Sequence, residues 1–352
     1  MAAFYLISLA LGVLIVSLRG SSIDLMHVLF GTVLALNNDA LWLITLITAV
    51  TLVTLAIFWR ALVAECMDPL FLRSVSKLGT PVHFIFHSAY CCSTLLARAF
   101  DTPGHAMGLK EPLILNDMVG WNLRGGDRGA VANVLDNALT LLARPMAPGE
   151  AMVVKPSNIA NGFMGAMLGL RPAARAVFLH APLRTYLASI AKKGIEGRLW
   201  VRTLQLNLLK EQRINLGFRQ EQYIEHTDLQ AAAIGWLVQH AEFQRLATKY
   251  GRDRVATLNS ETLLANPLAA MRALDRLFGT GMREDRLAAI VAGPAFNRNS
   301  KSGESYGSAQ RNDERAEAIR VHRHELDWVA GWAERVAGNA GIAMDLPAPL
   351  LG

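Results

Sequence analysis

The most apolar part of the chain lies at its N-terminus, where two long hydrophobic stretches stand close together. Leu41–Trp59 carries no charged residue, has a tryptophan near each end and is followed by Arg60. That length and composition predict a transmembrane helix with aromatic residues at the two interfaces. Ala2–Leu18 is shorter and lacks the basic start and cleavage site of a signal peptide, so we expect a second span there. Asp24–Leu36 is too short to span, and either lies at the interface or re-enters the membrane against protein.

After Ser76 the pattern changes to short apolar runs that alternate with helical periodicities. The runs predict four buried strands, at Val82–Phe86, Ala151–Val154, Arg175–Leu179 and Val255–Leu258, and a short strand-like piece begins at Met107. The main helical patterns cover Asp127–Ala143, Leu183–Lys193, Gly197–Leu216, Thr227–Tyr250 and Asp313–Val336. Such alternation predicts an α/β fold with a mostly parallel sheet and helices on both faces. The predicted domains are a short α-helical transmembrane segment at residues 1–76 and an α/β domain at residues 77–352.

The first predicted strand leads through a turn of small residues into a helix. The turn is Ser88–Cys92, and Ser93 and Thr94 open the helix. Unpaired backbone N–H groups and the helix dipole favour an anion at such a place. The two hydroxyls are suited to capping the helix or to donating to a phosphate oxygen. This is not a Walker A loop, because no Gly-Lys-Ser/Thr follows the turn. An ordinary capped strand–helix turn explains the same residues equally well.

The turns after the other strands are expected near this one. In a parallel sheet, ligands bind outside the carboxyl ends of the strands. The turns after His87, Val154, Leu179 and Leu258 should therefore face one crevice.

Charge is distributed unevenly along the chain. Residues 1–76 have three basic and four acidic residues, and the whole chain has 35 and 29, so the remainder has 32 and 25 and carries a net charge of +7. A basic domain fits an anionic ligand. No basic run interleaved with aromatic residues indicates nucleic acid, so we expect no nucleic-acid partner.

Cysteine usage and flanking charge indicate the compartment. Three cysteines, of which Cys91 and Cys92 are adjacent, cannot form a paired disulfide framework, which favours a reducing setting. Arg60, Arg73 and Lys77 follow the second predicted span, and basic residues favour the cytoplasmic side. We therefore expect a membrane protein whose C-terminal domain is cytoplasmic.

His87, Cys91 and Cys92 are residue types that bind metals. Adjacent cysteines rarely ligate one tetrahedral ion together, and no second ligand pair is placed, so we expect no metal. A helix N-terminus lowers the pKa of a nearby thiol. Even so, the two cysteines fit small loop positions better than nucleophiles.

The N-terminal segment resembles zinc/manganese-type ABC transporter permeases. The similarity covers about Ile7–Ser76 and rests on the run IDLMHVLFGTVLALNNDALWLI and on a span ending in FWRALV. It implies a membrane location and an ABC ATPase subunit as a partner. A transport path needs a full bundle of helices, and this segment offers two or three.

The rest of the chain resembles the P-loop sulfotransferase superfamily from about Pro81 to Val336. The motifs, in family order, are AYCCSTLL at 89–96, VVKPSN at 153–158, FLHAPLRTYLAS at 178–189 and VATLNSETLLANP at 255–267. The resemblance implies binding of 3′-phosphoadenosine 5′-phosphosulfate and transfer of its sulfuryl group to a hydroxyl or amine of a small-molecule or glycan acceptor.

The resemblance also implies roles for particular residues. Lys155 would be the electrostatic catalyst, with a solvated lysine at a strand end as the alternative. The candidates for donor binding are Tyr90, Cys91, Cys92, Ser93, Thr94, Arg184, Ser189, Lys301 and Arg311. Arg184 fits an anion partner or a salt bridge to Glu196 or Glu261. Lys301 and Arg311 flank a Gly- and Ser-rich loop that either closes over a phosphate or is a surface loop.

This sequence departs from the sulfotransferase pattern at several positions. Tyr90 stands where the family has Arg or Lys, Cys92 where it has Gly, and His180 where Arg is common. The acceptor-site histidine expected after Lys155 is absent, and Ser157 or Asn158 stands nearby. Two other hypotheses therefore remain: a nucleotide-binding or scaffolding domain without chemistry, and a truncated metal permease subunit fused to such a domain.

Overall fold

The computed structural model describes residues 42–54, 80–145, 147–210, 214–297 and 308–351. The chain divides into two compact units, Met1–Asp68 and Pro69–Gly352. In the first unit, residues 42–54 form a helix. Among the residues that the structure describes, no helix combines the length and hydropathy needed to cross a bilayer. The predicted span at Ala2–Leu18, the ends of the one at Leu41–Trp59 and the predicted boundary at 76/77 lie outside the described residues, so these remain predictions.

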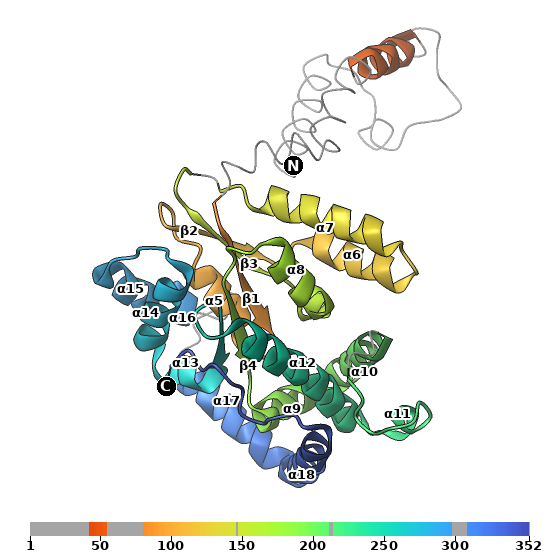
Figure 1. Cartoon of the computed structure of the whole chain (residues 1–352), viewed down its shortest axis with the longest axis vertical. Helices are drawn as coiled ribbons and strands as arrows, with labels where there is room; N and C mark the ends of the chain where they lie inside the picture. Colours follow the sequence, from red (N-terminus) through yellow and green to blue (C-terminus); the bar gives the residue numbers. More distant parts are fainter. Residues whose placement is uncertain (1–41, 55–79, 146, 211–213, 298–307, 352) are drawn as a thin grey trace, which may run out of the picture. The chain divides into compact units, whose positions relative to one another are not determined.

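The second unit is built on a five-stranded parallel sheet (Figure 1). Its strands are β1 (Val82–His87), β2 (Ala106–Lys110), β3 (Ala151–Lys155), β4 (Ala176–His180) and β5 (Val255–Asn259). Their order is β2-β3-β1-β4-β5, so β1 is central and pairs with β3 on one side and β4 on the other. The connections that leave β1 and β4 run to opposite sides, which places the topological switch point beside β1.

Helices cover both faces of this sheet (Figure 1). Because side chains alternate along a strand, Ile85 faces one core while Phe84 and Phe86 face the other. The first core includes side chains of α5, α9, α10, α12, α14 and α18, and the second includes those of α6, α7 and α8. This arrangement confirms the predicted α/β class and its parallel sheet.

The helices follow the predicted pattern with a few differences in their limits. In chain order they are α5 (Ser93–Ala99), α6 (Leu113–Leu123), α7 (Arg128–Leu142), the 3₁₀ helix η1 (Asn158–Phe163), α8 (Met164–Leu170), α9 (Leu183–Lys192), α10 (Gly194–Lys210), α11 (Gln222–Glu225), α12 (Asp228–Tyr250), α13 (Ser260–Ala265), α14 (Pro267–Phe278), α15 (Glu284–Ala292), α16 (Pro294–Asn297), α17 (Ser308–Val321) and α18 (Arg323–Ala340).

The last predicted helix is in fact two helices. The chain turns at His322, which is the N-cap of α18. This break lets α17 pack on α9 while α18 packs on both α12 and α9. Beyond α18 the chain returns to the sheet, where Thr257 N donates to Ala348 O (2.8 Å) and Leu350 N donates to Thr257 O (2.8 Å). The C-terminal segment thereby covers the exposed edge of β5.

Candidate functional site

The turn between β1 and α5 has an unusual backbone for its sequence. Ala89, Tyr90 and Cys92 have positive φ angles of 69°, 50° and 63°. Residues with a Cβ atom rarely adopt this left-handed region, and each instance stores free energy that the surrounding structure must supply. Cys92 is the N-cap of α5 and its side chain makes no capping hydrogen bond. The ordinary capped turn considered from the sequence is therefore not what forms.

His87 holds this turn against the neighbouring strand. Ala89 N donates to His87 Nδ1 (3.0 Å), so the ring proton lies on Nε2, which faces the carbonyl oxygen of Pro156 at 3.1 Å. Burial, followed by the positive charge of Lys155, holds the pKa of His87 well below its ordinary value, so the ring stays neutral. A neutral histidine with both nitrogens engaged ties the end of β1 to the end of β3.

Lys155 ends β3 at the bottom of the site and is 1% exposed. Its ammonium forms an ion pair with the carboxylate of Glu111, which is half exposed. The backbone reinforces the pair, because Glu111 N donates to Lys155 O (2.7 Å). Glu111 itself has a φ of +48°, a strained conformation for a non-glycine residue. The solvated lysine considered as an alternative is therefore not what the structure shows.

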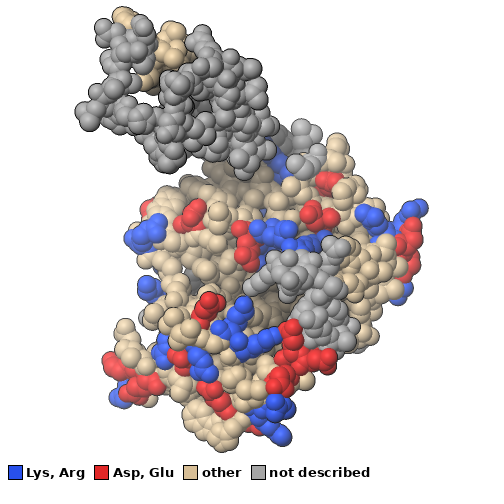
Figure 2. Space-filling model, turned by 180° about the vertical axis from the view of Figure 1, so that it is seen from behind, with Lys and Arg blue, Asp and Glu red and all other residues tan. Residues whose placement is uncertain are grey.

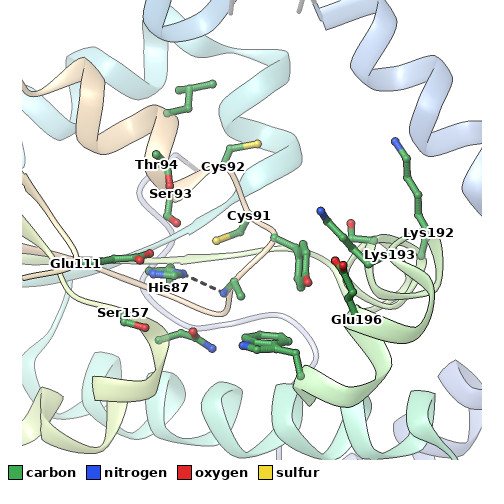
Figure 3. Close-up of a pocket in the computed structure, with 18 of the residues that line it drawn as sticks. His87, Cys91, Cys92, Ser93, Thr94, Glu111, Ser157, Lys192, Lys193 and Glu196 are labelled. Carbon is green, nitrogen blue, oxygen red and sulfur yellow. Dashed lines mark hydrogen bonds between the residues drawn. The ribbon is translucent and has the colours of Figure 1, made fainter. Parts of the chain in front are cut away.

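A pocket of about 580 Å³ opens at this end of the sheet and gathers most of the predicted residues. Tyr90, Cys91, Cys92, Ser93, Thr94, Lys155 and Ser189 all line it, together with Ser157 and Asn158. In Figure 3, His87, Glu111 and Ser157 lie on one side of the pocket and Lys192, Lys193 and Glu196 on the other. The turn after β1, the end of β3 and one side of α9 thus meet at this pocket.

One wall of the pocket is aromatic. The rings of Tyr90 and Trp200 meet edge to face with centroids 5.6 Å apart, and Tyr90 meets Tyr186 in the same way at 6.0 Å. Trp200 comes from α10 and also lines the pocket. Burial raises the pKa of Tyr90, so its hydroxyl is neutral at physiological pH. The sequence indicated Tyr90 but gave no signal for Trp200, because α10 folds back onto the turn.

The charges of the pocket are nearly balanced among the described residues. Three lysines (Lys155, Lys192, Lys193) and three glutamates (Glu111, Glu196, Glu314) line it. Lys192 pairs with Glu314 of α17. On the face shown in Figure 2, described Lys and Arg side chains are likewise interspersed with Asp and Glu. The sequence signal for these residues is the Lys192-Lys193 pair at the end of a predicted helix, which lies outside the sulfotransferase-like motifs.

Two of the four strand-end turns do not reach the pocket, so the expectation of one shared crevice is half wrong. The described pocket lining includes the turns after β1 and β3 but none from the ends of β4 and β5. The indole of Trp236 in α12 donates to Ala181 O (2.9 Å) and covers the turn after β4. His180 packs there against His240, with ring centroids 5.0 Å apart, and not against a ligand site.

Arg184 does not line the 580 Å³ pocket at the ends of β1 and β3, which we call the strand-end pocket. Its guanidinium pairs with Asp327 of α18, and both side chains are about half exposed. The predicted alternatives, Glu196 and Glu261, are not its partners: Glu196 lines the pocket, and Glu261 accepts a hydrogen bond from Thr185 (2.6 Å). The rotation of α9 about its axis puts Ser189 on the pocket and Arg184 away from it. Identifying where a helix starts in the sequence does not determine this rotation.

The predicted loop residues are placed only in part. Lys301 lies outside the described residues, and of Arg311 only the backbone position in α17 is described. That position is one helical turn before Glu314, which lines the pocket together with Ala318. The role of the loop remains a prediction.

The Cys91 thiol does not have the chemistry that a helix N-terminus suggests. Burial raises the pKa of the Cys91 thiol to about 12, so the expected lowering is wrong for this residue. Within the described ranges, no cluster of three or more His, Cys, Asp or Glu side chains is arranged to hold a metal ion.

The fold and site together define an α/β protein with a ligand-sized pocket at the carboxyl ends of a parallel sheet. Comparison with known proteins adds two similarities. A model of the ABC 3 transport family matches residues 1–93. The chain is 32% identical over 89 residues to the manganese import system permease protein ScaB of Streptococcus gordonii, covering 25% of this chain and 31% of that protein. It is 31% identical over 96 residues to the manganese transport system membrane protein MntC of Listeria innocua, covering 27% and 33%.

This chain therefore spans about a third of the length of the curated relatives that it matches. The family match also extends past the predicted boundary, because residues 82–87 form the central strand β1 of the sheet. The same residues thus fall within the permease similarity and at the centre of the α/β fold.

Solved structures give the second similarity. A sulfotransferase domain from the curacin biosynthetic pathway is 13% identical, with a TM-score of 0.46, over 77% of this chain and 99% of that chain. The sulfotransferase STF9 of Mycobacterium avium is 12% identical, with a TM-score of 0.41, over 73% and 80%. The comparisons thus return both kinds of protein that the motifs indicated, permeases at the N-terminus and sulfotransferase domains over most of the chain.

Proposed function

We propose that the α/β domain binds 3′-phosphoadenosine 5′-phosphosulfate in the strand-end pocket and transfers its sulfuryl group to a hydroxyl or amine acceptor. The observation that carries this proposal is the position of Lys155. Lys155 is 1% exposed and lines a pocket of about 580 Å³ together with the turn that opens α5. The Lys155 ammonium already pairs with Glu111, and an anionic ligand in the pocket would give this buried cation a second charged partner.

Lys155 would act on the leaving group. During transfer, the acceptor oxygen or nitrogen bonds to sulfur while the bond from sulfur to the bridging phosphate oxygen breaks. Negative charge grows on that bridging oxygen as adenosine 3′,5′-bisphosphate leaves. A fixed, buried ammonium stabilises this charge more than water does, because it does not have to reorganise during the reaction.

Glu111 would accept the acceptor's proton. Its carboxylate is half exposed on the pocket and pairs with Lys155, so it lies beside the reacting groups. His87 is unsuited to this role, because both ring nitrogens are engaged and its pKa is far below the ordinary value. Glu111 would therefore serve as the general base in place of the histidine that is absent after Lys155.

The aromatic wall suits the remainder of the donor. Tyr90 and Trp200 both line the pocket, and their rings meet edge to face. Purine rings stack on aromatic side chains in a way that tolerates varied geometry. On the opposite side, Lys193 lines the pocket without an ion-pair partner among the described side chains, and it would contact a phosphate of the donor.

Isothermal titration of the full chain with adenosine 3′,5′-bisphosphate tests the binding step. We expect a single site that weakens at least ten-fold in Lys155→Met, which keeps the side-chain length and removes the charge. Arg184→Ala is the control, because Arg184 lies outside the pocket and pairs with Asp327. Equal weakening by both variants, or no binding at millimolar nucleotide, would contradict the proposal.

The transfer step needs a separate measurement. Release of adenosine 3′,5′-bisphosphate from the donor is followed in the presence of a panel of alcohols, amines and glycans. Glu111→Gln should abolish acceptor-dependent release while nucleotide binding persists. Binding without any acceptor-dependent release would favour a nucleotide-binding domain without chemistry.

A second candidate function rests on the match of residues 1–93 to the ABC 3 transport family. We propose that this segment is membrane-associated and assembles with an ABC ATPase subunit in manganese transport. Co-purification of an ATPase subunit with the full chain, and altered manganese uptake in cells that lack it, are the expected results. Two C-terminal fusions test the cytoplasmic location. A green fluorescent protein fusion should fluoresce, and an alkaline phosphatase fusion at the same position should be inactive.

A further inference from the structure

A second pocket, of about 720 Å³, lies between the C-terminal half of α10 and the segment 214–224 that carries α11. Figure 1 shows α11 beyond the end of α10, away from the strand ends. The second pocket shares no lining residue with the strand-end pocket. Its walls are mainly apolar and come from Leu206, Leu209, Ile214, Phe218 and Ile224.

Several of these side chains are unusually exposed for their type. Leu206 is 60% exposed and Ile224 is 79% exposed. Apolar side chains gathered around a concavity of this size, and not scattered over the surface, are typical of a site for an apolar ligand.

Gln205 supplies an independent observation. It lines the second pocket, it is only 3% exposed, and its Nε2 has no hydrogen-bond partner among the described residues. A buried donor left without an acceptor costs about 1–3 kcal/mol. Such groups are rare in native structures and call for a missing partner. An acceptor oxygen carried by a ligand would remove this cost.

The charges beside the second pocket favour an anionic head group. Arg202 is already committed, because it donates to Asp228 Oδ1 (2.6 Å) and to His226 O (2.8 Å). Lys210 ends α10 on the lining of the pocket and makes no ion pair with a described side chain. Among the described side chains of the lining, Lys210 is a positive charge without an ion-pair partner and Gln205 Nε2 is a donor without an acceptor.

We propose that the second pocket binds a fatty acid, with the acyl chain against the apolar walls and the carboxylate near Gln205 and Lys210. The size is suitable, because pockets that enclose small organic ligands have volumes of roughly 300–1,000 Å³. Lys210 balances the negative charge, and rotation of the Gln205 side chain brings its buried Nε2 to a carboxylate oxygen. This site is independent of the strand-end pocket and of the sulfuryl transfer proposed there.

The test uses the full chain in lipid nanodiscs and dodecanoate carrying a diazirine at its chain end. After irradiation, mass spectrometry locates the label. We expect labelled peptides within residues 202–224 and loss of that labelling with excess unlabelled dodecanoate. Labelling that avoids this segment, or that does not compete, would overturn the proposal.

Two matched variants sharpen this test. Leu206→Glu places a carboxylate on the wall of the pocket, and Leu199→Glu makes the same change on the same helix outside it. The two leucines are equally exposed, at 60% and 61%, so neither substitution threatens the fold. Labelling should fall at least five-fold in the first variant and stay within two-fold of the unaltered chain in the second. Equal effects would contradict a specific site.

Gln205→Leu separates binding from a structural role. Replacing an unsatisfied amide by an apolar side chain of similar size should leave the ligand-free stability unchanged or raise it. Loss of one hydrogen bond should weaken dodecanoate binding by about three- to ten-fold. A variant that is less stable yet binds dodecanoate normally would show that the amide serves the fold alone.

Discussion

Cys92 shows how much the site depends on single residues. With φ at 63° and no side-chain cap, it occupies a position that suits glycine. The sulfotransferase resemblance predicted a glycine position at Cys92, and the positive φ of Cys92 is consistent with that prediction. What could not be predicted is that Ala89, Tyr90 and Glu111 also adopt positive φ angles, since nothing in these residue types signals it.

Cys92→Gly should stabilise the protein by about 1 kcal/mol. A residue with a Cβ costs roughly 1–2 kcal/mol in the left-handed region, and glycine removes this cost. Part of the gain is offset because glycine increases the conformational entropy of the unfolded chain. The measurement is the free energy of unfolding by urea. Cys92→Ala is the control, since it removes the thiol and keeps the Cβ. A gain of the same size in both variants would mean that the thiol, and not the backbone, is responsible.

The Lys155–Glu111 pair makes a second prediction at this scale. Glu111→Gln leaves a buried ammonium without its counter-charge and should destabilise the fold by about 1–3 kcal/mol, less than for a fully buried pair because Glu111 is half exposed. Adding Lys155→Met should recover part of the loss. A double-mutant cycle of unfolding free energies gives the coupling, and strict additivity would contradict the pairing.

At the scale of elements, the strands were predictable and the orientation of the helices was not. Continuous apolar runs marked β1, β3, β4 and β5 to within a residue or two, because fully buried parallel strands have no polar face. Helical periodicity located α9 but not its rotation, so it could not show that Ser189 lines the pocket while Arg184 pairs with Asp327 outside it. The partner of Arg184, Asp327, lies far along the chain on an element whose packing no local pattern fixes.

The contact between β4 and α12 predicts a loss of stability in acid. His240 of α12 faces His180 of β4, stacks on Trp236 (3.8 Å) and hydrogen-bonds Met344 O (3.1 Å). Burial lowers the pKa of His240 from 6.5 to about 3. Burial also lowers the pKa of His180 to about 4, although the negative charge of Asp345 acts in the opposite direction. The unfolded chain therefore takes up protons first, and stability falls as the pH drops below 6.5 toward these values.

His240→Gln keeps a donor for Met344 O and does not titrate. Between pH 6.5 and 5 it should lose about 1–2 kcal/mol less stability than the unaltered chain, because one pKa unit corresponds to about 1.4 kcal/mol. Urea unfolding at the two pH values gives the comparison. Parallel losses in both proteins would exclude His240 as the source.

At the scale of the whole molecule, the permease similarity and the α/β fold share residues. The family match ends at residue 93, whereas the sheet begins at residue 82. The sequence marked a change of pattern after Ser76 and predicted both resemblances. It could not show that the overlapping segment becomes the central strand, because that position depends on pairing with β3 and β4 from later in the chain.

Two deletions follow from this overlap. Removing residues 1–79 should leave nucleotide binding intact, since the described lining of the strand-end pocket lies between residues 87 and 318. Removing residues 1–93 takes out β1, which is paired on both sides, and should abolish folding. Circular dichroism and titration distinguish the two products. A folded product lacking residues 1–93 would contradict the central place of β1.

The most direct test of the account is a structure of the full chain with adenosine 3′,5′-bisphosphate. The account predicts the nucleotide in the strand-end pocket, with its 5′-phosphate within hydrogen-bonding distance of Lys155 Nζ and the backbone N–H groups of Cys92–Thr94, and its base against Tyr90 and Trp200. A nucleotide bound elsewhere, with the Lys155–Glu111 pair unchanged and the strand-end pocket empty, would contradict it.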